Sequence, residues 1–164
     1  MTNGDSSSDY PDPEEIDVTA VLEERGFDPD ESVLTQRQAE VYVLREREYR
    51  QRDVADILGT SRANVASVEA SARENVRKAR NTVGFADVLA SPIHVEVEPD
   101  ADLYDVPGRV FATCDDAGVN VNYTAPELME HVSEAAGDGV RGRQIVRRIV
   151  IGVTSEGEIS VTSR

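Results

Sequence analysis

Apolar positions recur with the period of an α-helix over residues 35–83, and they alternate with the period of a strand after residue 92. Thr35, with Gln38 three residues later, has the form of a capping box. A helix is therefore expected from Thr35 to about Tyr49. It turns an apolar face inward and a charged face outward, and the inward set is Ala39, Val41, Tyr42, Val43 and Leu44.

Two further helices are expected to follow, separated by a sharp turn at Gly59. The second should run from about Gln51 to Leu58. The third should be capped by Thr60 or Ser61 and reach about Thr82. A small residue suits the point where the two helices cross, because a larger side chain would force them apart. The residues expected to hold this crossing together are Val54, Ala55, Leu58, Val65 and Val68.

The outward face of the third helix carries polar side chains that suit the major groove of DNA. Arginine can bond guanine through two hydrogen bonds, and asparagine can bond adenine in the same way. We therefore expect Arg62, Asn64 and Ser67 to read bases. Hydroxyls, exposed helix amides and cationic side chains suit phosphates, which position a protein without reading sequence. The expected phosphate contacts are Gln51, Arg52, Thr60, Ser61, Arg73, Arg77 and Lys78.

Charge is distributed unevenly along the 164 residues, whose formal net charge is -15. Residues 1–33 hold one arginine and eleven acids, and residues 81–164 hold six arginines and fourteen acids. Residues 34–80, in contrast, hold nine arginines, one lysine and seven acids, so this segment alone is positive. The expected DNA-binding helices thus coincide with the basic segment.

The acidic excess itself is typical of proteins from salt-in halophilic archaea. The sequence pI is about 4.4, and Lys78 is the only lysine beside sixteen arginines. Carboxylates stay hydrated in molar salt, and their repulsion is screened over about 3 Å at 1 M. The net charge therefore reports an environment and does not exclude DNA as a partner.

Residues 34–83 resemble the Tfx family of archaeal DNA-binding transcription regulators, and their helix-turn-helix is similar to the fourth conserved region of bacterial sigma factors. The likeness is carried by LTxRQAEV, QxDVADILGTSRANV and RENVRKA, and it extends through the C-terminal region but not into residues 1–30. It implies a trihelical DNA-binding domain followed by a small α/β domain, acting in transcription. The recognition helix would start at Ser61, with Arg62, Asn64 and Ser67 as its readers.

The C-terminal region predicts a compact α/β domain. IHVEVE alternates as a strand, LYDVPGRVFATCDDAG suits a helix, VNVNY alternates again, and TAPELMEHVSEAAG opens with a cap and a proline. RQIVRRIVIGVTSEGEISVTSR then suits two strands joined by a turn at residues 155–157. The expected order is β-α-β-α-β-β, with helices against one sheet face.

The fold class expected for the whole chain is therefore α+β. Residues 1–30 should be an acidic, largely disordered extension, with a short helix within 16–27; residues 31–90 should form the helix-turn-helix domain. Residues 91–164 should form the α/β domain, used for dimerisation or for sensing a signal.

Few residue patterns in the sequence suggest catalysis or metal binding. His94 and His131 lie far apart without nearby cysteines, and Asp115 with Asp116 suits a solvated helix end. Phosphate-loop, zinc-protease and hydrolase motifs do not occur, and Cys114 suits a buried apolar position. We expect no enzyme activity, no metal and no cofactor. No run of 18 apolar residues is present, so a cytoplasmic protein that does not contact membrane is expected.

Two functions from different classes fit these observations. The first is a sequence-specific transcriptional regulator on double-stranded DNA. The second is an adaptor that docks on the basal transcription machinery without reading bases. An apolar stripe on the third helix suits either packing on the C-terminal domain or the seam of a homodimer. This stripe is formed by Ala72, Val76, Ala79 and Val83.

Overall fold

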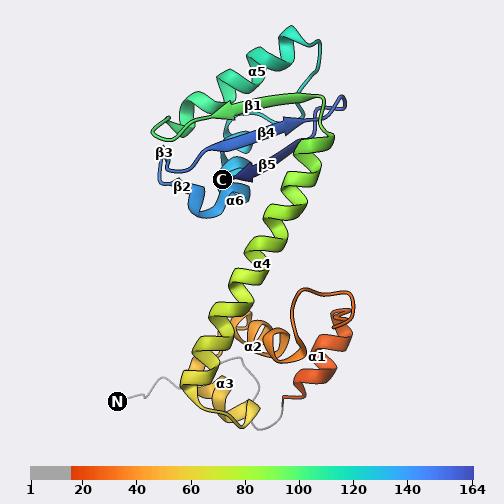
Figure 1. Ribbon diagram of the computed structural model, residues 1–164, viewed down its shortest axis with the longest axis vertical. Helices are drawn as coiled ribbons and strands as arrows, with labels where there is room; N and C mark the ends of the chain where they lie inside the picture. The colour runs from red at the N-terminus through yellow and green to blue at the C-terminus, as the bar shows by residue number, and fades with distance from the viewer. Residues whose placement is uncertain (1–15) are drawn as a thin grey trace, which may run out of the picture. The chain divides into compact units, whose positions relative to one another are not determined.

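The computed structural model describes residues 16–164, which divide into two compact units (Figure 1). The division falls between Arg77 and Lys78, inside the long helix α4 (Arg62–Ala90). Helices form the first unit, and the second contains a small antiparallel sheet with further helices. The expected α+β class is confirmed.

The first unit contains the helices that the sequence predicts, preceded by a short one. They are α1 (Val18–Glu24), α2 (Gln36–Glu46) and α3 (Gln51–Leu58), followed by the start of α4. The capping box is present, since Thr35 Oγ1 accepts the Gln38 N–H and the Gln38 side chain accepts the Thr35 N–H. Local sequence therefore sets the start of α2.

The turn between α3 and α4 forms at Gly59, whose φ is 62°. This left-handed conformation suits glycine, which has no Cβ to collide with the backbone. Apolar side chains from all four helices of the first unit form one core. Packing in this core fixes the angle at which α3 and α4 cross. The buried members of this core are Val18, Val41, Leu44, Tyr49, Val54, Ala55 and Val65.

The N-terminal part of this core was not expected in full. Residues 16–30, assigned by sequence to the acidic extension, contain α1, and both Val18 and Leu22 are buried. The short helix predicted within 16–27 is thus present, and the ordered part of the chain begins before residue 31. The disorder expected for residues 1–15 lies outside the described residues.

The second unit is built on a three-stranded antiparallel sheet in the order β1-β4-β5. In this sheet Ile93 pairs with Val153, and Val153 pairs with Ile159. The final hairpin predicted from the sequence is confirmed. The elements are β1 (Ile93–Val97), η2 (Leu103–Asp105), α5 (Val106–Asp116), α6 (Ala125–Ala136), η3 (Gly137–Gly139), β2 (Val140–Arg141), β3 (Gln144–Ile145), β4 (Ile149–Val153) and β5 (Ile159–Ser163).

Helices cover both faces of this sheet, where the sequence predicted one. Alternate residues of β1, β4 and β5 form one core with α5 and α6. On the other face, Gly152 lies against Val88 of α4, and His94 Nε2 lies 2.7 Å from the Val88 carbonyl oxygen. The sequence pattern predicted helices on the more apolar face alone. The other face was missed because Gly152 and His94 are not counted as apolar positions.

The helix α4 is longer than predicted, ending at Ala90 instead of near Thr82. Gly84 lowers the local helix propensity, yet a Cβ there would collide with the Val161 carbonyl oxygen of β5. Asn81 Oδ1 also accepts a 3.0 Å hydrogen bond from Thr162 Oγ1. Packing on the sheet therefore stabilises the last turns, and it requires glycine at this position.

The strand predicted at VNVNY does not form, and the order β-α-β-α-β-β is wrong in this respect. Residues 119–123 instead form an irregular segment whose Val119, Val121 and Tyr123 pack against the core. The Asn122 N–H bonds the Gly157 carbonyl oxygen at 3.2 Å. Alternating burial against a core thus imitated a strand without a neighbouring strand to pair with. The short pair β2 and β3 was not predicted.

Candidate nucleic-acid interface

The first turn of α4 presents polar side chains opposite the buried core. Ser61 Oγ accepts a 3.1 Å hydrogen bond from the Asn64 N–H and so caps the helix. Val65 is fully buried between α3 and α4, which directs the neighbouring positions outward. The exposed positions are Ser61, Arg62, Ala63, Asn64 and Ser67.

The amide of Asn64 is held in place by the turn. Its Nδ2 donates a 2.9 Å hydrogen bond to Thr60 Oγ1. The carboxamide oxygen accepts no hydrogen bond from any residue in the described range 16–164. A carboxamide fixed at a helix tip is suited to bonding a base edge, because little side-chain entropy remains to be lost on binding.

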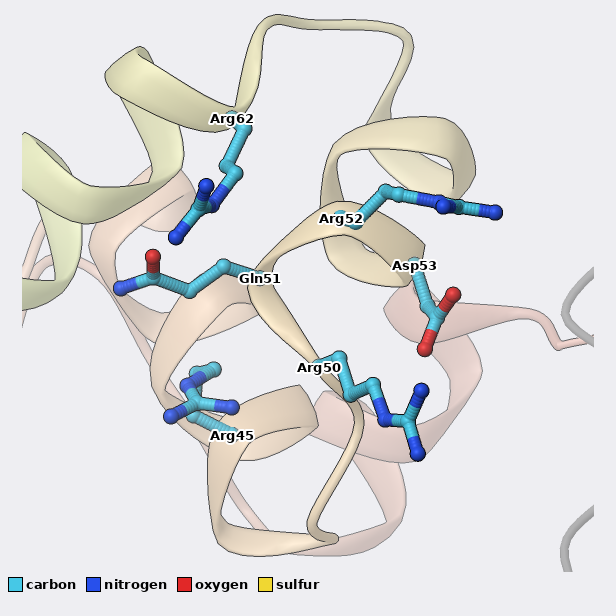
Figure 2. Close-up of a pocket in the computed structure, with 6 residues that line it drawn as sticks. All are labelled: Arg45, Arg50, Gln51, Arg52, Asp53 and Arg62. Atoms are coloured by element: carbon cyan, nitrogen blue, oxygen red, sulfur yellow. The ribbon is translucent and has the colours of Figure 1, made fainter.

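A pocket of about 490 Å³ lies beside this turn, where α2, α3 and α4 approach one another (Figure 2). Figure 2 shows Arg62 extending from the start of α4 toward Gln51 at the start of α3. Of its lining, the sequence predicted Gln51, Arg52 and Arg62 as DNA contacts. It missed Arg45, in the last turn of α2, and Arg50, which directly precedes α3. The full lining is Arg45, Arg50, Gln51, Arg52, Asp53 and Arg62.

Positive charge dominates this pocket, since four of the six lining residues are arginines and one is an acid. Arg45 is already engaged, donating to Glu69 at 3.0 Å and to the Tyr49 carbonyl oxygen at 2.6 Å. Arg50, Arg52 and Arg62 form no ion pair with any other residue of the described range. Figure 2 shows that these side chains point in different directions, Arg62 toward Gln51 and Arg50 toward the side of Asp53. A guanidinium without an internal ion pair suits an anion with several oxygens, such as a phosphate.

A buried carboxylate, Glu69, stands behind the pocket with only 7% of its surface exposed. It accepts hydrogen bonds from Arg45 Nε at 3.0 Å, from Gln51 Nε2 at 2.9 Å and from Arg73 Nε at 3.1 Å. These donors come from α2, α3 and α4. Glu69 therefore ties the three helices together and orients two of the pocket residues, Arg45 and Gln51.

Burial alone would raise the pKa of Glu69, but the hydrogen bonds from Gln51, Arg45 and Arg73 outweigh it, so the pKa lies below its usual value. Glu69 is thus an ionised group at neutral pH. The sequence held one signal for it: an acid at position 69 interrupts the inward stripe of Val65 and Ala72, four residues after the first and three before the second. A charged residue on an apolar helix face needs buried partners.

The basic residues farther along α4 are placed differently from the pocket arginines. Arg73 pairs with Glu69 and with Glu46 at 3.3 Å, and its guanidinium lies 5.6 Å from the Tyr42 ring centroid. Arg77 pairs with Glu74 at 2.7 Å. Phosphates would have to compete with these carboxylates, so Arg73 and Arg77 are weaker candidates than Arg50 and Arg52. Lys78 is exposed.

Two other titratable side chains lie in the second unit, against backbone or in the core. His131 Nε2 lies 3.2 Å from the Ile159 carbonyl oxygen, and burial raises the pKa of the Cys114 thiol, an unreactive setting. Across residues 16–164, no group of three or more His, Cys, Asp or Glu is arranged to hold a metal ion. The described helices also include none long and apolar enough to cross a membrane.

Comparison with known proteins identifies the family. A family model described as the C-terminal part of the DNA-binding protein TFX matches residues 79–161, slightly more than half of the chain. The chain belongs to the Tfx family. The resemblance noted in the sequence is thus confirmed, and the match falls on the second compact unit, which includes the end of α4.

Relatives within this family come from several archaea. A Haloarcula marismortui protein named "Putative transcriptional regulatory protein" is 47% identical over 148 residues, covering 90% of this chain and 93% of the relative. A Methanococcus vannielii protein of the same description is 35% identical over 80% of the chain and 92% of its own length. The "DNA-binding protein Tfx" of Methanothermobacter marburgensis is 34% identical, over 78% and 93% respectively. The halophilic Haloarcula relative agrees with the acidic composition.

Proposed function

We propose that this Tfx-family chain is a sequence-specific transcriptional regulator that binds double-stranded DNA in the cytoplasm, with the start of α4 in the major groove. The single observation that carries the proposal is the exposed tip Ser61–Asn64 directly beside a pocket in which three of four arginines form no ion pair within the described range. Groups suited to reading bases and groups suited to binding phosphate thereby adjoin at the start of α4, as in a helix-turn-helix reader.

Within this proposal Asn64 and Ser67 read base edges, as expected from the sequence. Asn64 Nδ2 has a second hydrogen besides the one that it donates to Thr60, so the carboxamide can bond adenine while the turn still holds it. Arg62 takes a role different from the one its sequence position suggested. Because Arg62 lines the pocket and its guanidinium extends toward Gln51, we assign it to a backbone phosphate, a role that we also give to Arg50 and Arg52.

Salt limits how such a protein can bind. Each phosphate contact costs about 8-fold in affinity for a tenfold rise in salt, because the counterions released on binding become concentrated in solution. The candidate site offers three arginines, Arg50, Arg52 and Arg62, that form no ion pair within the described range, so the site itself makes few such contacts. We infer that base contacts and packing supply more of its affinity than in a regulator from a low-salt cell.

The test is selection of fragmented genomic DNA by the full chain in molar KCl. Wild type should enrich one sequence motif, and Asn64→Ala combined with Ser67→Ala should lose that enrichment. Arg37→Ala, which removes an α2 arginine that pairs with Glu40 away from the pocket, serves as the matched control and should enrich the same motif. Equal failure of every protein, with native circular dichroism, would reject direct reading and favour an adaptor on the transcription machinery.

A further inference from the structure

The last turns of α4 expose large apolar side chains. Val83 is 61% exposed, Phe85 55% and Leu89 70%. These are three of the five large apolar residues that are exposed in the described part of the chain, and they lie within seven consecutive positions. Such a concentration on one helix marks a contact surface more often than a solvated one.

The position of this surface follows from how α4 packs. Gly84 and Val88 face the sheet, against Val161 and Gly152 respectively. Because a helix turns 100° per residue, Val83 and Ala86 point away from that sheet, and Leu89 lies beside them. We call Val83, Ala86 and Leu89 the outer face of α4; Phe85, two residues after Val83, is exposed on the opposite flank of the helix. It lies in the second compact unit.

The surroundings make this outer face unusual. Residues 81–164 contain six arginines and fourteen acids, yet Asp87 is the single charged residue from 81 to 90. A surface otherwise covered by carboxylates thus leaves one apolar helix face open. Covering that face would remove apolar area from water, which favours association.

Two charged residues on the edge of the outer face indicate what covers it. Arg80 and Asp87 are seven residues apart, which is close to two helical turns, so both lie along the same flank of α4, next to Val83. Both are exposed, and neither pairs with another charged residue of the described range.

We propose that the outer face of α4 binds the same face of a second copy of the chain, with the two helices antiparallel about a two-fold axis. Equivalent flanks face each other in an antiparallel pair, so Arg80 of each copy lies opposite Asp87 of the other. The two-fold axis therefore forms two equivalent ion pairs, one at each end of the contact. This self-complementarity is what selects a second copy over an unrelated partner.

Sedimentation equilibrium of the full chain in molar KCl, without DNA, tests the surface. Wild type should have twice the monomer mass of 17.9 kDa. Val83→Glu combined with Leu89→Glu should raise the dissociation constant at least about 10-fold, because two charges would be buried in an apolar contact. Val33→Glu is the matched control, since Val33 is also 61% exposed but lies outside α4. A monomeric wild type, or an unchanged double variant, would overturn the proposal.

Exchange of the flanking charges tests the antiparallel arrangement at the lowest KCl concentration that preserves the native circular dichroism. Arg80→Glu and Asp87→Arg should each weaken the homodimer, because each variant places like charges opposite one another. An equimolar mixture of the two variants should recover dimer, since acidic flanks of one copy then meet basic flanks of the other. No recovery on mixing contradicts the antiparallel pairing. Because mass is measured without DNA, this result is separate from whether the chain reads bases.

Discussion

Gln51 Nε2 donates a 2.9 Å hydrogen bond to the carboxylate of Glu69, joining the first residue of α3 to the buried side of α4. The same carboxylate holds Arg45 and Arg73. One buried acid therefore sets the spacing of the two helices that a helix-turn-helix must present together. The geometry of the pocket and the stability of the first unit should depend on this single group.

Glu69→Gln should lower the free energy of unfolding by about 2 kcal/mol, because it leaves Arg45 and Arg73 without their buried counter-charge. The loss is smaller than for a fully buried pair, since the Arg73 side chain is 48% exposed and water solvates it. Urea denaturation at constant KCl measures this change. Glu74→Gln, in an exposed pair with Arg77, is the control and should cost less than about 1 kcal/mol. Equal costs for both variants would contradict a special role for Glu69.

Acid should destabilise the first unit through the same residue. The folded pKa of Glu69 lies below its usual value of 4.5, so its ionised form contributes stability above that pH. This contribution is lost as the pH falls from 4.5 through the folded pKa. Unfolding free energies measured from pH 6 downward should fall less steeply for Glu69→Gln than for wild type at about this pH. Parallel curves would show that Glu69 does not titrate as its contacts indicate.

Gly84→Ala should destabilise the second unit by about 2 kcal/mol or more, because the new Cβ collides with the Val161 carbonyl oxygen, which is backbone and moves little. Gly108→Ala, a helical glycine in α5 with nothing within 4 Å, should instead stabilise by about 0.5 kcal/mol. Thermal unfolding of both variants decides the comparison. Similar effects would mean that α4 does not pack on β5 as described.

The helices of the first unit could be predicted from sequence because their signals are local. Thr35 with Gln38 marks a start, and Gly59 marks a left-handed end. The end of α4 and the segment VNVNY were predicted wrongly because their structure depends on distant contacts. Whether a glycine ends a helix, or an alternating segment joins a sheet, depends on which distant residues pack against it, here Val161 and Gly157.

In the candidate site, too, features set by local sequence were predicted and features set by contacts between helices were not. The exposed tip of α4 follows from helical periodicity, and its residues lie where they were expected. Arg45 and Arg50 escaped prediction because they line the same pocket as Arg62 only when α2, α3 and α4 pack together. Glu69 escaped because spacing alone does not reveal that three donors from separate helices converge on one carboxylate.

The salt dependence of DNA binding should separate phosphate contacts from base contacts. Arg52→Ala should reduce the slope of log affinity against log salt by about 0.9, whereas Asn64→Ala should lower affinity with the slope unchanged. Fluorescence anisotropy with the selected motif, over a range of KCl, gives both slopes. Arg37→Ala controls for the general loss of a cation. A changed slope for Asn64→Ala would argue against its assignment to a base.

Arg62→Ala decides between the two roles available to the arginine at the tip of α4. Its guanidinium extends toward Gln51 in the pocket, so we expect affinity to fall by a similar factor on the selected motif and on every single-base variant of it. A base-reading arginine would behave otherwise: its loss would relax preference at one G·C pair by about 1 to 3 kcal/mol and leave other positions unchanged. Competition binding against the full set of single-base variants measures this directly. Relaxed preference confined to one position would return Arg62 to the base-reading role that its place in the sequence suggested.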